Sequence, residues 1–282
     1  MSRRRSASAF CVMHHASMNP FRTIDISDPR FEAEGLRHLT VKSPSLRGRG
    51  DLTVWAPSGV QPMALVILLH GVYGSHWCWA LKGGAHRTAR RLIDAGLVPP
   101  LALAMPSDGL RGDGTGYMRH GDGSDYERWI VDEVPLAACS AVVGLAASVP
   151  LCLAGLSMGG FGALRLGARH STRVGAISGH SSMTHFTQMS RFVEEDPAAF
   201  GTLATEASVL DAIIGAGDRL PPLRFDCGAE DDLLEANRDL HRALQARGIA
   251  HVYEEFPGDH TWPYWETHLD DTLRFFGKVV RP

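Results

Sequence analysis

The stretch Gly155-Leu156-Ser157-Met158-Gly159-Gly160 has the pattern G-x-S-x-G, and its neighbours decide how it is interpreted. A short apolar run, residues 149–154, precedes it, and a helical pattern covers residues 161–169. A strand, this motif and a helix in that order predict a sharp turn that exposes a serine hydroxyl at the end of a sheet. Glycines on both sides of the serine relieve crowding, since glycine adopts backbone angles that other residues avoid. We therefore expect Ser157 to be a nucleophile.

Strand and helix patterns alternate along the rest of the chain. Residues 36–42 and 52–56 are typical of an antiparallel hairpin, which we expect at the edge of a sheet. Further strands are predicted over residues 64–69, 101–105, 151–154, 174–178, 223–228 and 251–256, and helices over residues 85–95, 125–139, 232–247 and 262–279. This alternation predicts an α/β fold, with a mainly parallel central sheet and helices on both faces.

The length of 282 residues fits one large domain with a substantial core. Residues 1–22 begin with a basic stretch but lack the apolar centre of a signal peptide, so we predict a disordered tail. A single domain is then expected over residues 23–282. The strand–helix alternation weakens over residues 181–222, a segment too long for an ordinary connection. We predict that it is a partly helical, cap-like insertion over the strand ends.

Composition argues against several classes of function. The net charge of -3 favours neither nucleic acid nor an anionic membrane as a partner, and no apolar run approaches the length of a membrane span. The five cysteines include no C-x-x-C pair, which indicates buried, reduced thiols in a cytoplasmic protein. Neither phosphate-binding glycine spacings nor metal-ligand spacings occur, so we expect no cofactor and no metal. The sequence leaves open whether the chain forms a homo-oligomer.

A serine hydroxyl needs a neighbouring base to act as a nucleophile at neutral pH. Two segments after Ser157 could supply the base and the acid that orients it. Residues 228–232 follow one predicted strand, and Pro257-Gly258-Asp259-His260 follows the last one. Both lie where parallel strands place their loops at the carboxyl edge of a sheet. We predict His260 as the general base.

Four carboxylates compete for the acid position, namely Glu230, Asp231, Asp232 and Asp259. Asp259 adjoins His260 in sequence, so their side chains diverge. Asp232 suits the N-cap of the following helix, where a carboxylate accepts amide hydrogens. Glu230 has a longer side chain than such a site is expected to need. We predict Asp231 as the acid.

The loop after the first buried strand, His70-Gly71-Val72-Tyr73-Gly74, could help to bind the transition state. Hydrolases with this motif take one oxyanion donor from such a loop and another from the residue after the nucleophile. We therefore expect the backbone N–H groups of Val72 and Met158 to form an oxyanion hole, assisted by the positive end of the helix that follows Ser157.

Bulky or polar side chains near the expected pocket predict a small substrate. No long apolar stretch in residues 181–222 indicates a tunnel for a fatty acyl chain. The side chains predicted to bind substrate are Tyr73, Trp77, His180 and Trp262. They favour a short acyl group, roughly acetyl to butyryl, or a compact aromatic acid.

Five motifs together resemble the putative esterase family of α/β-hydrolases. They occupy residues 68–71, 105–109, 155–160, 227–231 and 256–262. The family includes esterase D (S-formylglutathione hydrolase), tributyrin-type, feruloyl and acetyl-xylan esterases and the antigen 85 mycolyltransferases. The resemblance implies an α/β-hydrolase fold over roughly residues 36–280, and acyl-serine chemistry on carboxylic esters or thioesters without a cofactor.

Two alternatives to a serine carboxylesterase stay open. One is an acyltransferase that uses the same site, with an alcohol or sugar in place of water. The other is a non-catalytic binding protein on a hydrolase fold, against which the complete order Ser157, Asp231, His260 argues. In the favoured interpretation the partner is a small-molecule ester.

Overall fold

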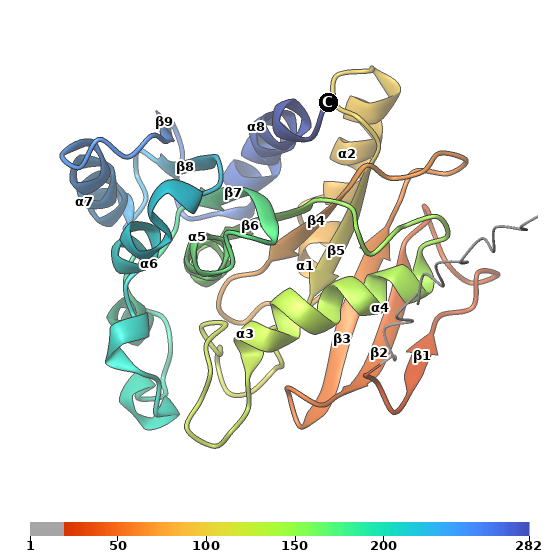
Figure 1. The fold of residues 1–282 in the computed structure, drawn as a ribbon, viewed down its shortest axis with the longest axis horizontal. Helices are drawn as coiled ribbons and strands as arrows, with labels where there is room; N and C mark the ends of the chain where they lie inside the picture. Colours follow the sequence, from red (N-terminus) through yellow and green to blue (C-terminus); the bar gives the residue numbers. More distant parts are fainter. Residues whose placement is uncertain (1–19, 282) are drawn as a thin grey trace, which may run out of the picture.

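The computed structural model describes residues 20–281, and nine strands within this range form one sheet (Figure 1). The strand order is β1-β2-β3-β5-β4-β6-β7-β8-β9. The strands are β1 (Ile24–Ile26), β2 (Arg37–Ser43), β3 (Gly48–Trp55), β4 (Ala64–Leu69), β5 (Leu101–Pro106), β6 (Leu151–Leu156), β7 (Val174–His180), β8 (Leu223–Gly228) and β9 (Val252–Phe256). Pairing is antiparallel from β1 through β3 to β5 and parallel from β5 through β4 to β9. The predicted mainly parallel α/β sheet is confirmed.

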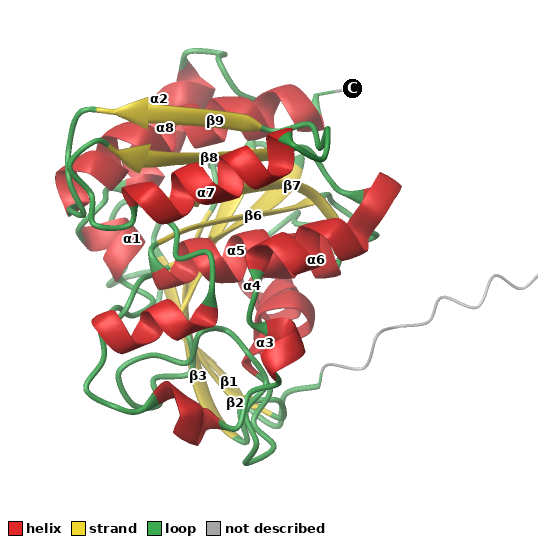
Figure 2. Cartoon of the chain, turned by 90° about the vertical axis from the view of Figure 1, so that its left-hand side faces the viewer, coloured by secondary structure: helices red, strands yellow, loops and turns green. Residues whose placement is uncertain are grey.

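Helices cover both faces of the sheet (Figure 2). One face carries α1 (Cys78–Leu81), α2 (Ala85–Asp94) and α8 (Trp262–Val280). The other carries α3 (Tyr126–Arg128), α4 (Val134–Ala141), α5 (Met158–Arg169), α6 (Val209–Ala216) and α7 (Leu234–Gln245), with a π-helical turn, η1 (Trp129–Glu133), between α3 and α4. None of the helices within residues 20–281 combines the length and apolar composition needed to cross a bilayer.

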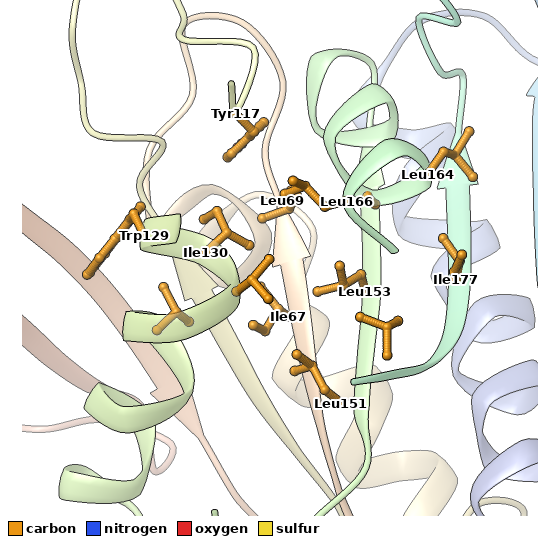
Figure 3. Packing of buried hydrophobic residues seen from close by; sticks show 14 of the residues in the cluster. Ile67, Leu69, Tyr117, Trp129, Ile130, Leu151, Leu153, Leu164, Leu166 and Ile177 are labelled. Carbon is orange, nitrogen blue, oxygen red and sulfur yellow. The ribbon is translucent and has the colours of Figure 1, made fainter. Parts of the chain in front are cut away.

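The central strand β4 shows why two helical layers form. All six of its residues are buried, and alternate side chains point to opposite faces. Ile67 and Leu69 pack on the α4 and α5 side with Trp129 (Figure 3). Val66 and Leu68 belong instead to the cluster beneath α1, α2 and α8. Fully burying one such side chain contributes about 1.5–3 kcal/mol, so a strand that is apolar throughout requires cover on both faces.

The N-terminal part differs from the expectation in two ways. The predicted hairpin exists as β2 and β3, but β1 pairs with β2 and forms the sheet edge in its place. Three residues with an aspartate at the centre are too short to show a strand pattern. In addition, Phe21 is only 7% exposed and joins the core, although it precedes the residue predicted to begin the domain, residue 23. The rest of the predicted tail, residues 1–19, lies outside the described residues.

Between β7 and β8 the chain forms short helices. Besides α6 these are η2 (Phe186–Arg191), η3 (Pro197–Phe200), η4 (Ala204–Glu206) and η5 (Gly217–Arg219). Met183, Phe186 and Met189 are buried in the same cluster as the side chains of α5. This segment therefore packs on the main core. Whether it acts as a cap stays a prediction.

The four cysteines in the described part of the chain are free thiols. Cys78, Cys152 and Cys227 are buried as predicted, whereas Cys139 is half-buried. Cys11 lies outside the described residues.

Residues 20–281 contain no group of three or more His, Cys, Asp or Glu side chains arranged to hold a metal ion.

Candidate active site

Ser157 occupies a sharp turn between β6 and α5. Its φ of 55° and ψ of -118° lie in a region that non-glycine residues rarely adopt. Two backbone hydrogen bonds hold the turn: the Ser157 N–H donates to the carbonyl of His180 and the Phe161 N–H donates to that of Ser157, both at 3.0 Å. Strain of this kind persists only where the surrounding structure enforces it, and it clusters at functional sites. The predicted turn is confirmed.

Two glycines of the motif allow α5 to approach the sheet. A Cβ atom on Gly155 would lie 2.2 Å from the carbonyl oxygen of Gly159. A Cβ on Gly159 would lie 2.2 Å from the carbonyl oxygen of Leu69, at the end of β4. Neither distance is compatible with a side chain. The motif is therefore required by the packing of β4, β6 and α5, and that packing places the N-terminus of α5 beside Ser157.

Three chain segments meet at the carboxyl edge of the sheet. Ser157 follows β6, Asp231 follows β8 and His260 follows β9. The Ser157 Oγ lies 3.0 Å from His260 Nε2, and His260 Nδ1 lies 2.9 Å from Asp231 Oδ2. The side chain of Asp231 is completely buried, whereas that of His260 is 25% exposed. The structure thus brings the three predicted residues together, with the histidine between the hydroxyl and the carboxylate.

The other candidate carboxylates have different partners. Glu230 accepts the N–H of Gly258 at 2.6 Å, a contact that ties the loop after β8 to the loop after β9. Asp259 accepts the hydroxyl of Thr261 at 2.6 Å. Asp232 is exposed. Of the four carboxylates considered from the sequence, Asp231 alone is hydrogen-bonded to the imidazole of His260.

The prediction that Asp232 caps the following helix is wrong. Helix α7 begins at Leu234, with Leu233 at its N-cap, and the Leu233 N–H donates to Asp231 Oδ1 at 2.8 Å. Burial acts to raise the pKa of Asp231, but the hydrogen bond and charge of His260 outweigh it and hold the pKa below its usual value. Asp231 is therefore ionised at neutral pH, which keeps a proton on His260 Nδ1 and leaves Nε2 free to accept one.

The loop after β4 lies against the serine turn. A Cβ atom on Gly71 would lie 3.2 Å from the Ser157 Cβ, a tight contact that would require the serine turn to shift. Val72 lines the same cleft as Ser157. Met158 is the first residue of α5, and N–H groups in the first turn of a helix have no acceptor within it. Both predicted oxyanion donors therefore lie beside the candidate nucleophile.

His70 orients the Gly71–Val72 peptide. Its ring is buried, with Nδ1 2.7 Å from the carbonyl oxygen of Gly71 and Nε2 3.1 Å from the backbone nitrogen of Asp108. Because the Asp108 N–H donates to Nε2, the ring proton is on Nδ1 and donates to Gly71. A peptide is planar and trans, so a fixed Gly71 carbonyl also fixes the opposite direction of the Val72 N–H.

A cleft of about 540 Å³ opens over Ser157 and His260. Three predicted substrate-binding residues, Tyr73, Trp77 and Trp262, line it. Cavities that bind small molecules have volumes of about 300–1,000 Å³ and mostly apolar walls. The cleft is therefore large enough for a compact ester.

The prediction that His180 lines the pocket is wrong. His180 ends β7 and is completely buried beneath the serine turn, where its backbone carbonyl accepts the Ser157 N–H. Its Nδ1 lies 2.9 Å from Asp226, and its Nε2 lies 2.9 Å from the hydroxyl of Thr272. Asp226 also pairs with Arg224. A histidine that is predicted to follow a strand can thus be the last residue of that strand and lie buried behind the site. The length of the strand decides which side chains reach the edge of the sheet.

Several cleft residues were not predicted from the sequence. Phe192 and Trp265 both contact the ring of His260, and Lys82 lines the wall beside Trp262. Trp265 could have been found, because it lies one helical turn after Trp262 on α8. Phe192 and Lys82 carry no local signal, since tertiary packing alone brings them to the cleft.

A family model described as Putative esterase matches residues 43–276. The chain belongs to this esterase family. An acetyl esterase of Caldicellulosiruptor saccharolyticus is 25% identical to this esterase over 230 residues, which cover 75% of the esterase and 82% of the relative. Family membership and this relative identify the protein as a carboxylic ester hydrolase.

Solved structures share the α/β-hydrolase fold with this esterase. A ferulic acid esterase superposes with a TM-score of 0.71 at 23% identity, over 86% of the esterase and 98% of that chain. An S-formylglutathione hydrolase from Agrobacterium tumefaciens gives a TM-score of 0.71 at 18% identity, over 93% and 99% of the two chains. For MPT51 of Mycobacterium tuberculosis the TM-score is 0.66 at 16% identity, over 86% and 97%. The predicted family and fold are confirmed.

Proposed function

We propose that this esterase hydrolyses esters of short-chain or compact aromatic acids through an acyl-serine intermediate. The observation that carries the proposal is the unbroken hydrogen-bond series from Ser157 through His260 to Asp231. A serine hydroxyl with a positioned base, and a base oriented by a carboxylate, is the arrangement that nucleophilic ester cleavage requires.

The first half of the reaction forms the acyl-enzyme. The Ser157 Oγ attacks the ester carbonyl carbon while His260 Nε2 takes the hydroxyl proton. The N–H groups of Val72 and Met158 donate to the oxyanion, and Asp231 stabilises the imidazolium ion. His260 then gives its proton to the departing alcohol oxygen as the carbon–oxygen bond breaks, so the acyl group stays on Ser157.

The second half repeats these steps with water. His260 removes a proton from water as the water oxygen attacks the acyl carbon, then returns the proton to the Ser157 Oγ as the acid leaves. A thioester reacts in the same way, with a thiol as leaving group. If an alcohol replaced water in this step, the enzyme would act as an acyltransferase. The amount of transesterified product formed after an alcohol is added measures the fraction of turnovers that follow this route.

The walls of the cleft support a small acyl group. Trp77, Trp262, Phe192 and Tyr73 confine a space of about 540 Å³ that is open to solvent on one side. Each further methylene gains about 1 kcal/mol in an apolar pocket only while the chain fits. The buried free thiols of Cys152 and Cys227 support a reducing, cytoplasmic location as part of the same proposal.

The decisive experiment compares the wild type with Ser157→Ala on p-nitrophenyl esters from acetate to palmitate. We expect the wild type to be fastest on acetate to butyrate, and Ser157→Ala to lose about 10⁴–10⁶-fold in kcat. A fluorophosphonate probe should label the wild type and leave the variant unlabelled. Residual labelling or hydrolysis near the wild-type level would contradict the nucleophile, and fastest turnover of palmitate would contradict the substrate class.

A further inference from the structure

A lysine, Lys82, lies in the wall of the catalytic cleft. Lys82 follows α1, and its backbone N–H donates to the carbonyl of Cys78, so its position relative to the cleft is fixed. The ammonium group lies 6.0 Å from the ring centre of Trp77 and 5.7 Å from that of Trp262. Gly83 lets Trp262 pack this closely, since a Cβ there would lie 2.9 Å from the indole. The exposed Lys82 ammonium group thus lies close to two tryptophans in the wall of the cleft that contains Ser157.

Among residues 20–281, no acidic side chain forms an ion pair with Lys82. No carboxylate in this part of the chain lines the cleft. At Tyr73, another residue of the cleft wall, burial together with Asp113, Glu194 and Glu195 raises the pKa of the phenol. Another cation, Arg191, lies over Phe192 and is occupied by the carbonyl of Asp232. Lys82 is therefore the cation best placed to receive a negative group on a bound ester.

We propose that Lys82 is a specificity-determining residue that binds a carboxylate at the non-reacting end of the substrate, so that this enzyme prefers anionic esters. The proposal rests on the function proposed above and names the substrate class more narrowly. The indole rings of Trp77 and Trp262 provide flat apolar surface next to the ammonium group. An ester with a flat or short apolar part and a terminal carboxylate would satisfy both features.

The test uses two pairs of esters that differ only in a carboxylate or its neutral amide. In one pair, 4-acetoxybenzoate and 4-acetoxybenzamide, the charge is on the leaving group. In the other, 4-nitrophenyl 4-carboxybenzoate and 4-nitrophenyl 4-carbamoylbenzoate, it is on the acyl group. The readout is the ratio of kcat/KM for the acid to that for the amide. Comparing this ratio between variants cancels the intrinsic reactivity of the esters and tells which side of the scissile bond faces Lys82.

In at least one pair, Lys82→Met should lower the ratio roughly fivefold, the upper end of the range expected for an exposed charged contact. The loss should be mainly in KM. Lys82→Arg should keep the ratio within about threefold, because it retains the charge, and higher salt should lower the wild-type ratio. Lys278→Met is the matched control: Lys278 is exposed and lies 16 residues after Trp262 on α8, about 24 Å along the helix axis.

An unchanged ratio in Lys82→Met for both pairs would overturn the proposal. So would an equal fall in Lys278→Met, or a fall in Arg191→Met that exceeds the fall in Lys82→Met. These outcomes are distinct from failure of the proposed function, which would appear as hydrolysis of the neutral amide esters that survives Ser157→Ala. A circular dichroism spectrum equal to that of the wild type shows that each variant is folded.

Discussion

The ring of Phe192 lies nearly parallel to the imidazole of His260, with ring centres 5.7 Å apart and planes inclined by 15°. Trp265 meets the same imidazole edge-on, at 5.0 Å and 90°. Phe192 comes from the segment between β7 and β8, and Trp265 comes from α8. Two elements that are distant in sequence thus restrict rotation of the histidine and leave its hydrogen bonds to Ser157 and Asp231 aligned.

Phe192→Ala should therefore lower kcat by about three- to tenfold, because an aromatic contact of this kind contributes about 0.5–1.5 kcal/mol. The measurement is steady-state hydrolysis of p-nitrophenyl acetate. Phe31→Ala is the matched control, since Phe31 is 84% exposed and lies far from the site in sequence. A kcat for Phe192→Ala equal to that of the control would show that the stacking does not position His260.

Asp231→Asn should lower kcat by up to about 10⁴-fold, because an amide at this position favours the wrong tautomer of the catalytic histidine. Asp232→Asn is the matched control, since Asp232 is adjacent and exposed. It should remain near the wild type in both activity and Tm, because Leu233, and not Asp232, is the N-cap residue of α7. If Asp232→Asn were the inactive variant, the assignment of the acid would be wrong.

His70→Ala should lower kcat more than it changes KM. Loss of the Nδ1 contact frees the Gly71 carbonyl and, with it, the direction of the Val72 N–H. Removing an oxyanion donor costs about 10²–10³-fold in kcat, and misalignment should cost part of that. His70→Asn should retain more activity, since its amide nitrogen can replace Nδ1 as donor. Equal kcat losses in the two variants, or a change in KM alone, would argue against this positioning role.

Stability should fall steeply below about pH 5. Burial acts to raise the pKa of Glu127, but the hydrogen bond of His170 and the charges of Arg165 and Arg169 outweigh it and lower the pKa to about 2. A pKa that is lower in the folded state than in the unfolded state contributes stability above the unfolded value of about 4.3, and this is lost as the pH falls towards the folded value.

Glu127→Gln should therefore reduce the dependence of Tm on pH between pH 5 and pH 2, because one fewer group takes up a proton on unfolding. It should also lower Tm at pH 7, since it leaves the completely buried Arg165 with a weaker partner. Thermal unfolding followed by circular dichroism across this range provides both values. Parallel Tm curves for variant and wild type would show that the Glu127 cluster does not contribute to acid sensitivity.

Local patterns in the sequence were sufficient for the serine turn. Ser157, the strand before it and the helix after it are neighbours in the chain, and the glycines at 155 and 159 are required by contacts within the same turn and with β4. The alternation of buried strands and helices likewise predicted the parallel sheet. His260 could be predicted because the loops after parallel strands reach one edge. Strand β1 could not be predicted from the sequence, because three residues with a polar residue at the centre show no strand pattern.

Only the tertiary structure decided which distant side chains surround Ser157. His180 follows its strand like a site residue, yet β7 extends to include it, and its side chain is buried against Asp226. Phe192 and Lys82 reach the cleft from segments with no motif. Sequence patterns record interactions between residues close in the chain, and they predict the elements and the loops that end them. Contacts between elements depend on how those elements pack, and here packing brings groups 103 residues apart, such as Ser157 and His260, within hydrogen-bond distance.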